Sequence, residues 1–140
     1  MLWITRAHVH VDRVACPWLI SRFIDSQAEF LFVAKNMVKE AVEKTDGIPF
    51  DVEGCELGHK DGHCSFISII MKYNLKDPAL LSLAEVVNAA DTDNLDSNPY
   101  ARGLEAIAQG FSTRFPEDME NLAHQFDVYD ALYAFFKTRQ

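Results

Sequence analysis

The stretch HVHVDRVACPWLISRF, residues 8–23, decides the fold, because it joins the first predicted strand to the first predicted helix. Its apolar residues recur at helical spacing, at Val11, Val14, Trp18 and Leu19 among others. Pro17 lacks a backbone N–H and disfavours helical geometry at the residue before it. Either the helix begins near Cys16 with Pro17 at its first position, or it begins near residue 12 and bends at Pro17.

Working outward from this stretch, the pattern alternates between short β-rich segments and helices. Strands are predicted over 2–9 and 28–34, a third short strand or extended segment over 48–54, and a short helix over 36–46. Further helices are predicted over 64–74, 77–90, 98–113 and 116–137, the last three entered at proline. The expected fold is α+β, with a small sheet of about three strands from the N-terminal half, about five to six helices and a helical C-terminal half. We expect residues 1–140 to form a single domain.

Composition and charge exclude several classes of protein. The formal net charge is −8, and phosphate contacts require a cationic surface, so we expect no direct binding of nucleic acid. No apolar run reaches the roughly 20 residues of a membrane span, and we expect no membrane partner. Three cysteines in irregular spacing argue against a disulfide framework. We therefore expect a cytoplasmic protein.

Residues that bind metals gather in three places. His8 and His10 are two residues apart, a spacing that puts both side chains on one face of an extended chain. His59 and Cys64 lie in the glycine-bearing loop 55–64, and Asp91 follows the helix predicted over 77–90. Imidazole and thiolate ligands suit zinc or iron, and carboxylates widen the choice.

The candidate residues of the first helix, and Cys64, also have structural explanations. Asp12 could cap the helix that follows it, and Arg13 could simply pair with an acidic neighbour. Trp18 is typical of a core residue. Cys16 and Cys64 are the candidate catalytic thiols, because a helix N-terminus lowers the pKa of a thiol, but either could be a small buried residue.

Longer segments resemble a known family. The segments WITRAHVHVDRVACPWLISRFIDSQAEFLFV (3–33) and IPFDVEGCELGHKDGHCSF (48–66) are similar to the ChrB-type C-terminal domain of the chromate resistance protein family, as are DPALLSLAEVVNAADTDN (77–94) and VYDALYAFF (128–136). The resemblance implies a role in chromate resistance and no residue roles. The positions that match the family pattern are His10, Asp12, Arg13, Trp18, Arg22, His59, Cys64 and Asp91. Ile67 stands where relatives usually have an acidic residue.

Two versions of a binding or sensing module compete. A cation site would use His10, His59, Cys64 and Asp91 as metal ligands, with zinc or iron as the expected metal. A small oxyanion such as chromate would use Arg13, Arg22 and the helix start near Pro17. We assign Asp12, Arg13, Trp18 and Arg22 to ligand binding, and the aspartates favour the cation.

Two other hypotheses remain open. The protein could be a thiol- or metal-dependent enzyme of oxyanion or sulfur chemistry. It could instead be a regulatory interaction domain, with a homodimer contact on the aromatic last helix. The decisive expectation is that His10, His59 and Cys64 converge in one pocket near the helix that contains Pro17.

Overall fold

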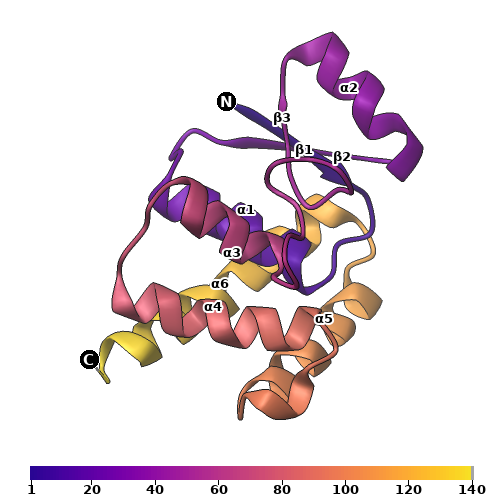
Figure 1. The fold of residues 1–140 in the computed structure, drawn as a ribbon. Coiled ribbons are helices and arrows are strands. Elements are labelled where there is room, and N and C mark those ends of the chain that lie inside the picture. The colour runs from indigo at the N-terminus through magenta and orange to yellow at the C-terminus, as the bar shows by residue number, and fades with distance from the viewer. Residues whose placement is uncertain (140) are drawn as a thin grey trace.

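The computed structural model describes residues 1–139. They contain three parallel strands and six α-helices, joined by loops (Figure 1). The N-terminal half contains β1 (Leu2–Arg6), α1 (Val11–Phe23), β2 (Glu29–Val33), α2 (Val38–Thr45) and β3 (Ile48–Pro49). The C-terminal half contains α3 (Ser65–Lys72), α4 (Pro78–Asp91), α5 (Ala101–Arg114) and α6 (Asp118–Lys137). Short 3-10 turns cover Lys35–Met37 and Leu95–Ser97.

The sheet has the strand order β2-β1-β3, and both pairings are parallel. The central strand β1 is buried on both faces, with Trp3 2% and Ile4 0% exposed. Trp3 packs into the main core with residues of α1. Ile4 points the other way, toward Gly47 at the end of α2. Helices therefore cover both faces of the sheet, α2 on one side and α1 on the other (Figure 1).

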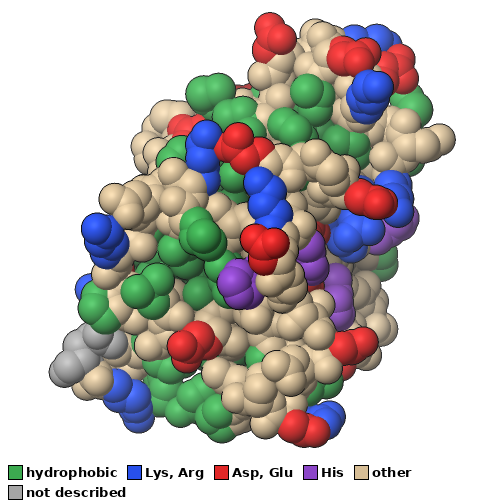
Figure 2. Space-filling view, in the orientation of Figure 1, with side chains coloured by type: hydrophobic (Ala, Val, Ile, Leu, Met, Phe, Trp, Pro, Cys, Tyr) green, Lys and Arg blue, Asp and Glu red, His purple; other side chains and the backbone are tan. Residues whose placement is uncertain are grey.

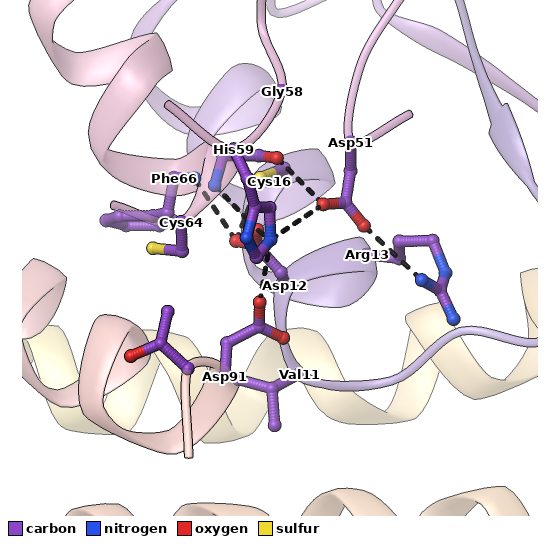
Figure 3. Close-up of polar contacts among 12 residues, drawn as sticks. Val11, Asp12, Arg13, Cys16, Asp51, Gly58, His59, Cys64, Phe66 and Asp91 are labelled. Carbon is purple, nitrogen blue, oxygen red and sulfur yellow. Dashed lines mark hydrogen bonds and ion pairs between the residues drawn. The ribbon is translucent and has the colours of Figure 1, made fainter. Parts of the chain in front are cut away.

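The helix α1 lies at the centre of the helical half, where it contacts α3, α4, α5 and α6. Its side chains from Val11 to Ile20 are almost all buried. This explains why the stretch is apolar around much of its circumference rather than on one stripe. The entrance of α1 lies next to the loop that precedes α3 and the last turn of α4 (Figures 1 and 3).

The α+β prediction is confirmed, with three strands and a helical C-terminal half. Of the two alternatives for the first helix, the early start is right: α1 begins at Val11 and Pro17 lies inside it. The third strand was predicted too long. It covers two residues, because the chain turns at Asp51, whose φ of 50° is incompatible with a strand.

Within residues 1–139, no helix combines the length and the apolar character that crossing a membrane requires.

Candidate metal centre

Four polar side chains from four separate segments meet at the entrance of α1 (Figure 3). Asp12 is the second residue of α1, Asp51 lies two residues after β3, and Asp91 is the last residue of α4. His59 comes from the loop that precedes α3. The fold thus brings together residues that lie up to about 80 positions apart in the chain.

The imidazole of His59 is the centre of this cluster. Its Nε2 lies 3.0 Å from an Asp91 carboxylate oxygen, 3.4 Å from Asp51 and 3.5 Å from Asp12. Potential ligand atoms of Asp12, His59 and Asp91 all lie within 4.8 Å of one another. His59 is 48% exposed, whereas Asp12 and Asp51 are 1% and 3% exposed. The cluster therefore has a buried acidic floor and an open side at His59.

The loop that carries His59 is held close to the preceding chain by Gly58. A Cβ atom at this position would lie 2.7 Å from the backbone carbonyl of Val52, which is too close for any side chain. The Gly58 carbonyl accepts a hydrogen bond from the Ser68 hydroxyl at 2.6 Å, which ties the loop to α3. These contacts fix the point from which the imidazole reaches the acidic floor.

Asp12 caps a helix, but not its own. Its two carboxylate oxygens accept the backbone N–H groups of Ser65 at 2.8 Å and Phe66 at 3.1 Å, in the first turn of α3. The prediction that Asp12 caps α1 is therefore wrong. The N-cap of α1 is His10, which makes no capping hydrogen bond with its side chain. Free N–H groups at a helix start attract a carboxylate wherever it comes from.

Asp91 plays the corresponding role for α1, since its carboxylate accepts the backbone N–H of Asp12. Burial is the main reason why the pKa of Asp91 is raised, and the charge of Asp51 adds to the effect. The carboxylates of Asp12 and Asp91 thus accept backbone N–H groups at the starts of α3 and α1, and both lie beside the imidazole of His59.

Asp51 is the acid of the cluster whose negative charge lies beside arginines. It accepts the Ser65 hydroxyl at 2.7 Å, and its other oxygen lies 3.4 Å from Nη1 of Arg13 and 4.0 Å from Nη2 of Arg6. Arg13 thus makes the pairing with an acidic neighbour that was the structural alternative to its predicted role in ligand binding. Arg13 also donates to the His8 carbonyl at 2.6 Å, which holds the turn before α1.

The electrostatics of the cluster follow from its burial. Loss of solvent raises the pKa of Asp12 to about 7, and the charges of Asp51 and Asp91 act in the same direction. The hydrogen bond with Asp12 raises the pKa of His59 to about 9, although partial burial opposes this. Near pH 7 the positive charges of His59 and Arg13 therefore offset part of the acidic charge.

Of the two alternatives for the candidate thiols, the structure supports small buried residues rather than activated nucleophiles. Cys16 is in the middle of α1 rather than at its start, it is fully buried, and its S–H donates to Asp12 at 3.3 Å. Cys64 is the N-cap of α3, but it too is fully buried. Burial raises the pKa of both thiols, with the charge of Asp12 adding to it. The expected lowering by a helix N-terminus is therefore wrong.

Of the four predicted metal ligands, the structure brings His59 and Asp91 together. The sulfur of Cys64 points away from the imidazole (Figure 3) and does not belong to the ligand group. His10 lines a cavity of about 580 Å³ together with His59, Asp91 and Glu105, but it also lies outside that group. The expected convergence of His10, His59 and Cys64 is thus replaced by an Asp12, His59 and Asp91 cluster.

The remaining ligand-binding candidates, Trp18 and Arg22, face α6 instead. The Trp18 indole N–H donates to Asp130 at 2.7 Å, and the Arg22 guanidinium binds both oxygens of the same carboxylate at 3.0 and 3.1 Å. Trp18 is 1% exposed and packs against Tyr133 and Phe23. These two side chains join α1 to α6, and no helix start exists at Pro17 to bind an oxyanion.

Sequence reasoning missed Asp51. It was placed inside a strand, where an acidic side chain has no special meaning. The available signal was its position just after a short apolar segment, because residues that follow parallel strands gather at one edge of a sheet.

Comparison with known proteins gives two matches. Residues 3–136 match the family model described as the ChrB C-terminal domain. Protein ChrB of Cupriavidus metallidurans is 34% identical over 139 residues, which is 97% of this chain and 41% of that protein. The chain therefore spans about two fifths of the length of this relative. No solved structure matches.

Proposed function

We propose, because the chain belongs to the family of ChrB C-terminal domains, that it is a metal-binding module of a chromate resistance system. It would hold one divalent cation between Asp12, His59 and Asp91. The observation that carries this proposal is the convergence of carboxylates from α1, α4 and the β3–α3 connection on a single imidazole nitrogen.

The spacing of the ligand atoms supports a bound ion. Nitrogen and oxygen ligands about 2.0–2.2 Å from a metal lie roughly 3.0–3.6 Å apart in tetrahedral or octahedral geometry. The distances from the His59 nitrogen to Asp91 and Asp12, 3.0 and 3.5 Å, fall in this range. A cation could therefore replace the proton on His59 with small movements.

The donor set narrows the choice of metal. One imidazole and carboxylates without a thiolate favour borderline or hard cations over soft ones. Zinc and ferrous iron remain our expected metals, and manganese is the natural comparison. Since His59 is the exposed member of the set, the open side of the site would carry water or a bound ligand.

The charge distribution argues against the competing oxyanion site. Three carboxylates meet here, and the neighbouring Arg13 already pairs with Asp51. The thiol version of an enzyme gains no support either, because both candidate thiols are buried with raised pKa. A sensing role is supported by the position of the cluster, because its residues connect the starts of α1 and α3 with the end of α4.

The setting of the module belongs to the same proposal. We place the module in the cytoplasm. We expect no direct contact with nucleic acid, since the net charge is −8. The homodimer contact on the last helix stays a prediction.

Elemental analysis of untagged protein tests the metal site. We expect about one equivalent of zinc, iron or manganese after incubation and desalting, and loss of that metal in His59→Ala and Asp91→Asn. The matched controls are His63→Ala in the same loop and Asp93→Asn, two residues after Asp91, because both side chains are exposed and lie outside the ligand group. Folded protein that binds none of these metals would contradict the proposal, as would equal loss of metal in the control variants.

A further inference from the structure

A second and larger cavity lies at the carboxyl end of the sheet. It has a volume of about 860 Å³ and is bounded by α2 and the loop that follows β3. Residues that end or follow all three strands line it: Arg6 ends β1, Lys35 follows β2, and Asp51 follows β3. Strand alternation places Arg6 on the same face as Ile4, which is the face that α2 covers.

The topology of the sheet marks the same place. From β1 the chain passes to β2 on one side, and from β2 it crosses to β3 on the other side. The direction of strand progression therefore reverses between β1 and β3. Ligands of open parallel sheets bind outside the carboxyl ends of the strands at such a point. Arg6 from β1 and Pro49 from β3 both line the cavity, so the cavity lies where the topology predicts a ligand.

The walls of the cavity combine apolar and cationic side chains. Val38, Val42, Pro49 and Val52 form an apolar surface, and Arg6, Lys35 and Lys39 supply positive charge. Arg6 is 36% exposed, and its Nη2 lies 4.0 Å from Asp51, a distance longer than a hydrogen bond, so the guanidinium can still bind a ligand. The cavity is in the range of about 300–1,000 Å³ that small organic ligands occupy, and a bare tetrahedral oxyanion would fill little of it.

The neighbouring charges narrow the ligand class. Glu43, Asp51 and Glu53 also line the cavity, which disfavours a molecule with several negative charges. Phosphate-binding folds of this type use a glycine-rich turn and a free helix start after the first strand. Here residues 7–10 contain no glycine, and Asp91 already accepts a backbone N–H at the start of α1. A carboxylate fits this setting better than a phosphate.

We propose that this cavity binds a small organic carboxylate, with its carboxylate at Arg6 and its apolar body against Val38 and Val42 of α2. His59 lines both this cavity and the smaller one beside Asp91, so the ligand would lie next to the cation site. Only this adjacency rests on the proposed metal function, and the cavity itself does not.

Titration of ¹⁵N-labelled protein with cinnamate tests the proposal, because cinnamate has an apolar body and a single carboxylate. We expect saturable shifts of the amide signals of Arg6 and of segments 35–43 and 50–55. Neutral cinnamamide should bind about tenfold more weakly, since it forms no charge-assisted hydrogen bond. Lys39→Met should weaken binding of cinnamate about threefold. The matched control is Lys44→Met, the same change on the same helix at a residue that does not line the cavity, and it should leave binding unchanged.

Each titration is run on protein stripped with EDTA and on protein reloaded with zinc. The absence of saturable shifts in both forms would overturn the carboxylate site, even if zinc binds. So would equal affinity for cinnamate and cinnamamide, or equal effects of the two lysine variants. Saturable binding in both forms together with failure to bind any metal would leave the carboxylate site standing and refute the metal function alone.

Discussion

Asp12 contributes both to the fold and to the candidate metal centre. Its buried carboxylate accepts two backbone N–H groups of α3. In Asp12→Asn one of these donors would face an amide NH₂ group instead of an oxygen. We expect this variant to lose about 1–3 kcal/mol of unfolding free energy, measured by urea denaturation. Asp61→Asn, at an exposed loop position, is the control and should change stability little. An unchanged midpoint for Asp12→Asn would show that these capping bonds do not contribute to stability.

Asp130 predicts a pH dependence in a different part of the molecule. The hydrogen bonds from Arg22 lower the pKa of Asp130 below 3.8, and the Trp18 indole acts in the same direction. A lowered pKa in the folded state stabilises the protein above the ordinary pKa, and this contribution disappears as the pH falls through the lowered value. Asp130→Asn should therefore reduce Tm at about pH 6 and have little effect at about pH 3.

The size of this effect is limited, because both partners are more than 40% exposed, at 43% and 42%. We expect less than about 1 kcal/mol, measured by thermal unfolding at the two pH values. Asp127→Asn, at an exposed residue of α6, provides the comparison. A difference between wild type and Asp130→Asn that grows toward low pH would refute the assignment.

Single residues of the cluster could be found in the sequence only in part. His59 stood out because a glycine-bearing loop has no packing need for an imidazole, and Asp12 and Asp91 were both proposed as contributors. Cys64 could not be ruled out, because residue type and spacing do not reveal that its sulfur turns inward at the start of α3. That orientation depends on packing between distant segments.

At the scale of elements, substitution of two glycines by alanine should have opposite effects on stability. A Cβ atom on Gly47 would lie 2.4 Å from Cδ1 of Ile4, where α2 ends against β1, whereas nothing lies within 4 Å of a Cβ atom on Gly110 in α5. We expect Gly47→Ala to cost about 1–3 kcal/mol of unfolding free energy through overpacking. Gly110→Ala should gain about 0.5–1 kcal/mol through helix propensity. Chemical denaturation of both variants measures the difference, and a stabilised Gly47→Ala protein would contradict the close packing of α2 on the sheet.

The elements themselves were largely predictable, because α2, α3 and α5 have a clear apolar face and three helices begin near proline. The start of α1 was ambiguous for a physical reason. Proline is costly inside a helix, but burial of the surrounding residues from Val11 to Ile20 outweighs that cost here. Local propensity cannot show when tertiary packing will override it.

For the whole molecule, a bound cation would link segments that are far apart in the chain. Its ligands come from α1, the loop before α3, and α4, so a metal ion should stabilise the folded state globally. At a concentration of about 100 times Kd, the gain is roughly 2.7 kcal/mol. Tm should rise with zinc relative to EDTA in wild type and in Asp93→Asn, but not in Asp91→Asn. Equal shifts in all three proteins would indicate that the ion binds elsewhere.

The sheet order and the two cavities were beyond the reach of the sequence. Three parallel strands can be arranged in several orders with the same periodicity, and in the observed order β2-β1-β3 the residues Arg6, Lys35 and Asp51 line one cavity. On the face shown in Figure 2, histidines gather beside basic and acidic side chains. A net charge of −8 gives no hint of such local grouping.

The two hydrogen bonds between α3 and Asp12 have a consequence for ion selectivity at the proposed site. A carboxylate that already holds two backbone N–H groups cannot swing outward to widen its coordination shell. Calcium requires about six to eight oxygen ligands at roughly 2.3–2.6 Å in a pliable arrangement, and this stiff, narrow donor set cannot supply them. In the proposed site, ionic radius would therefore act as the filter and would favour smaller transition-metal ions over calcium.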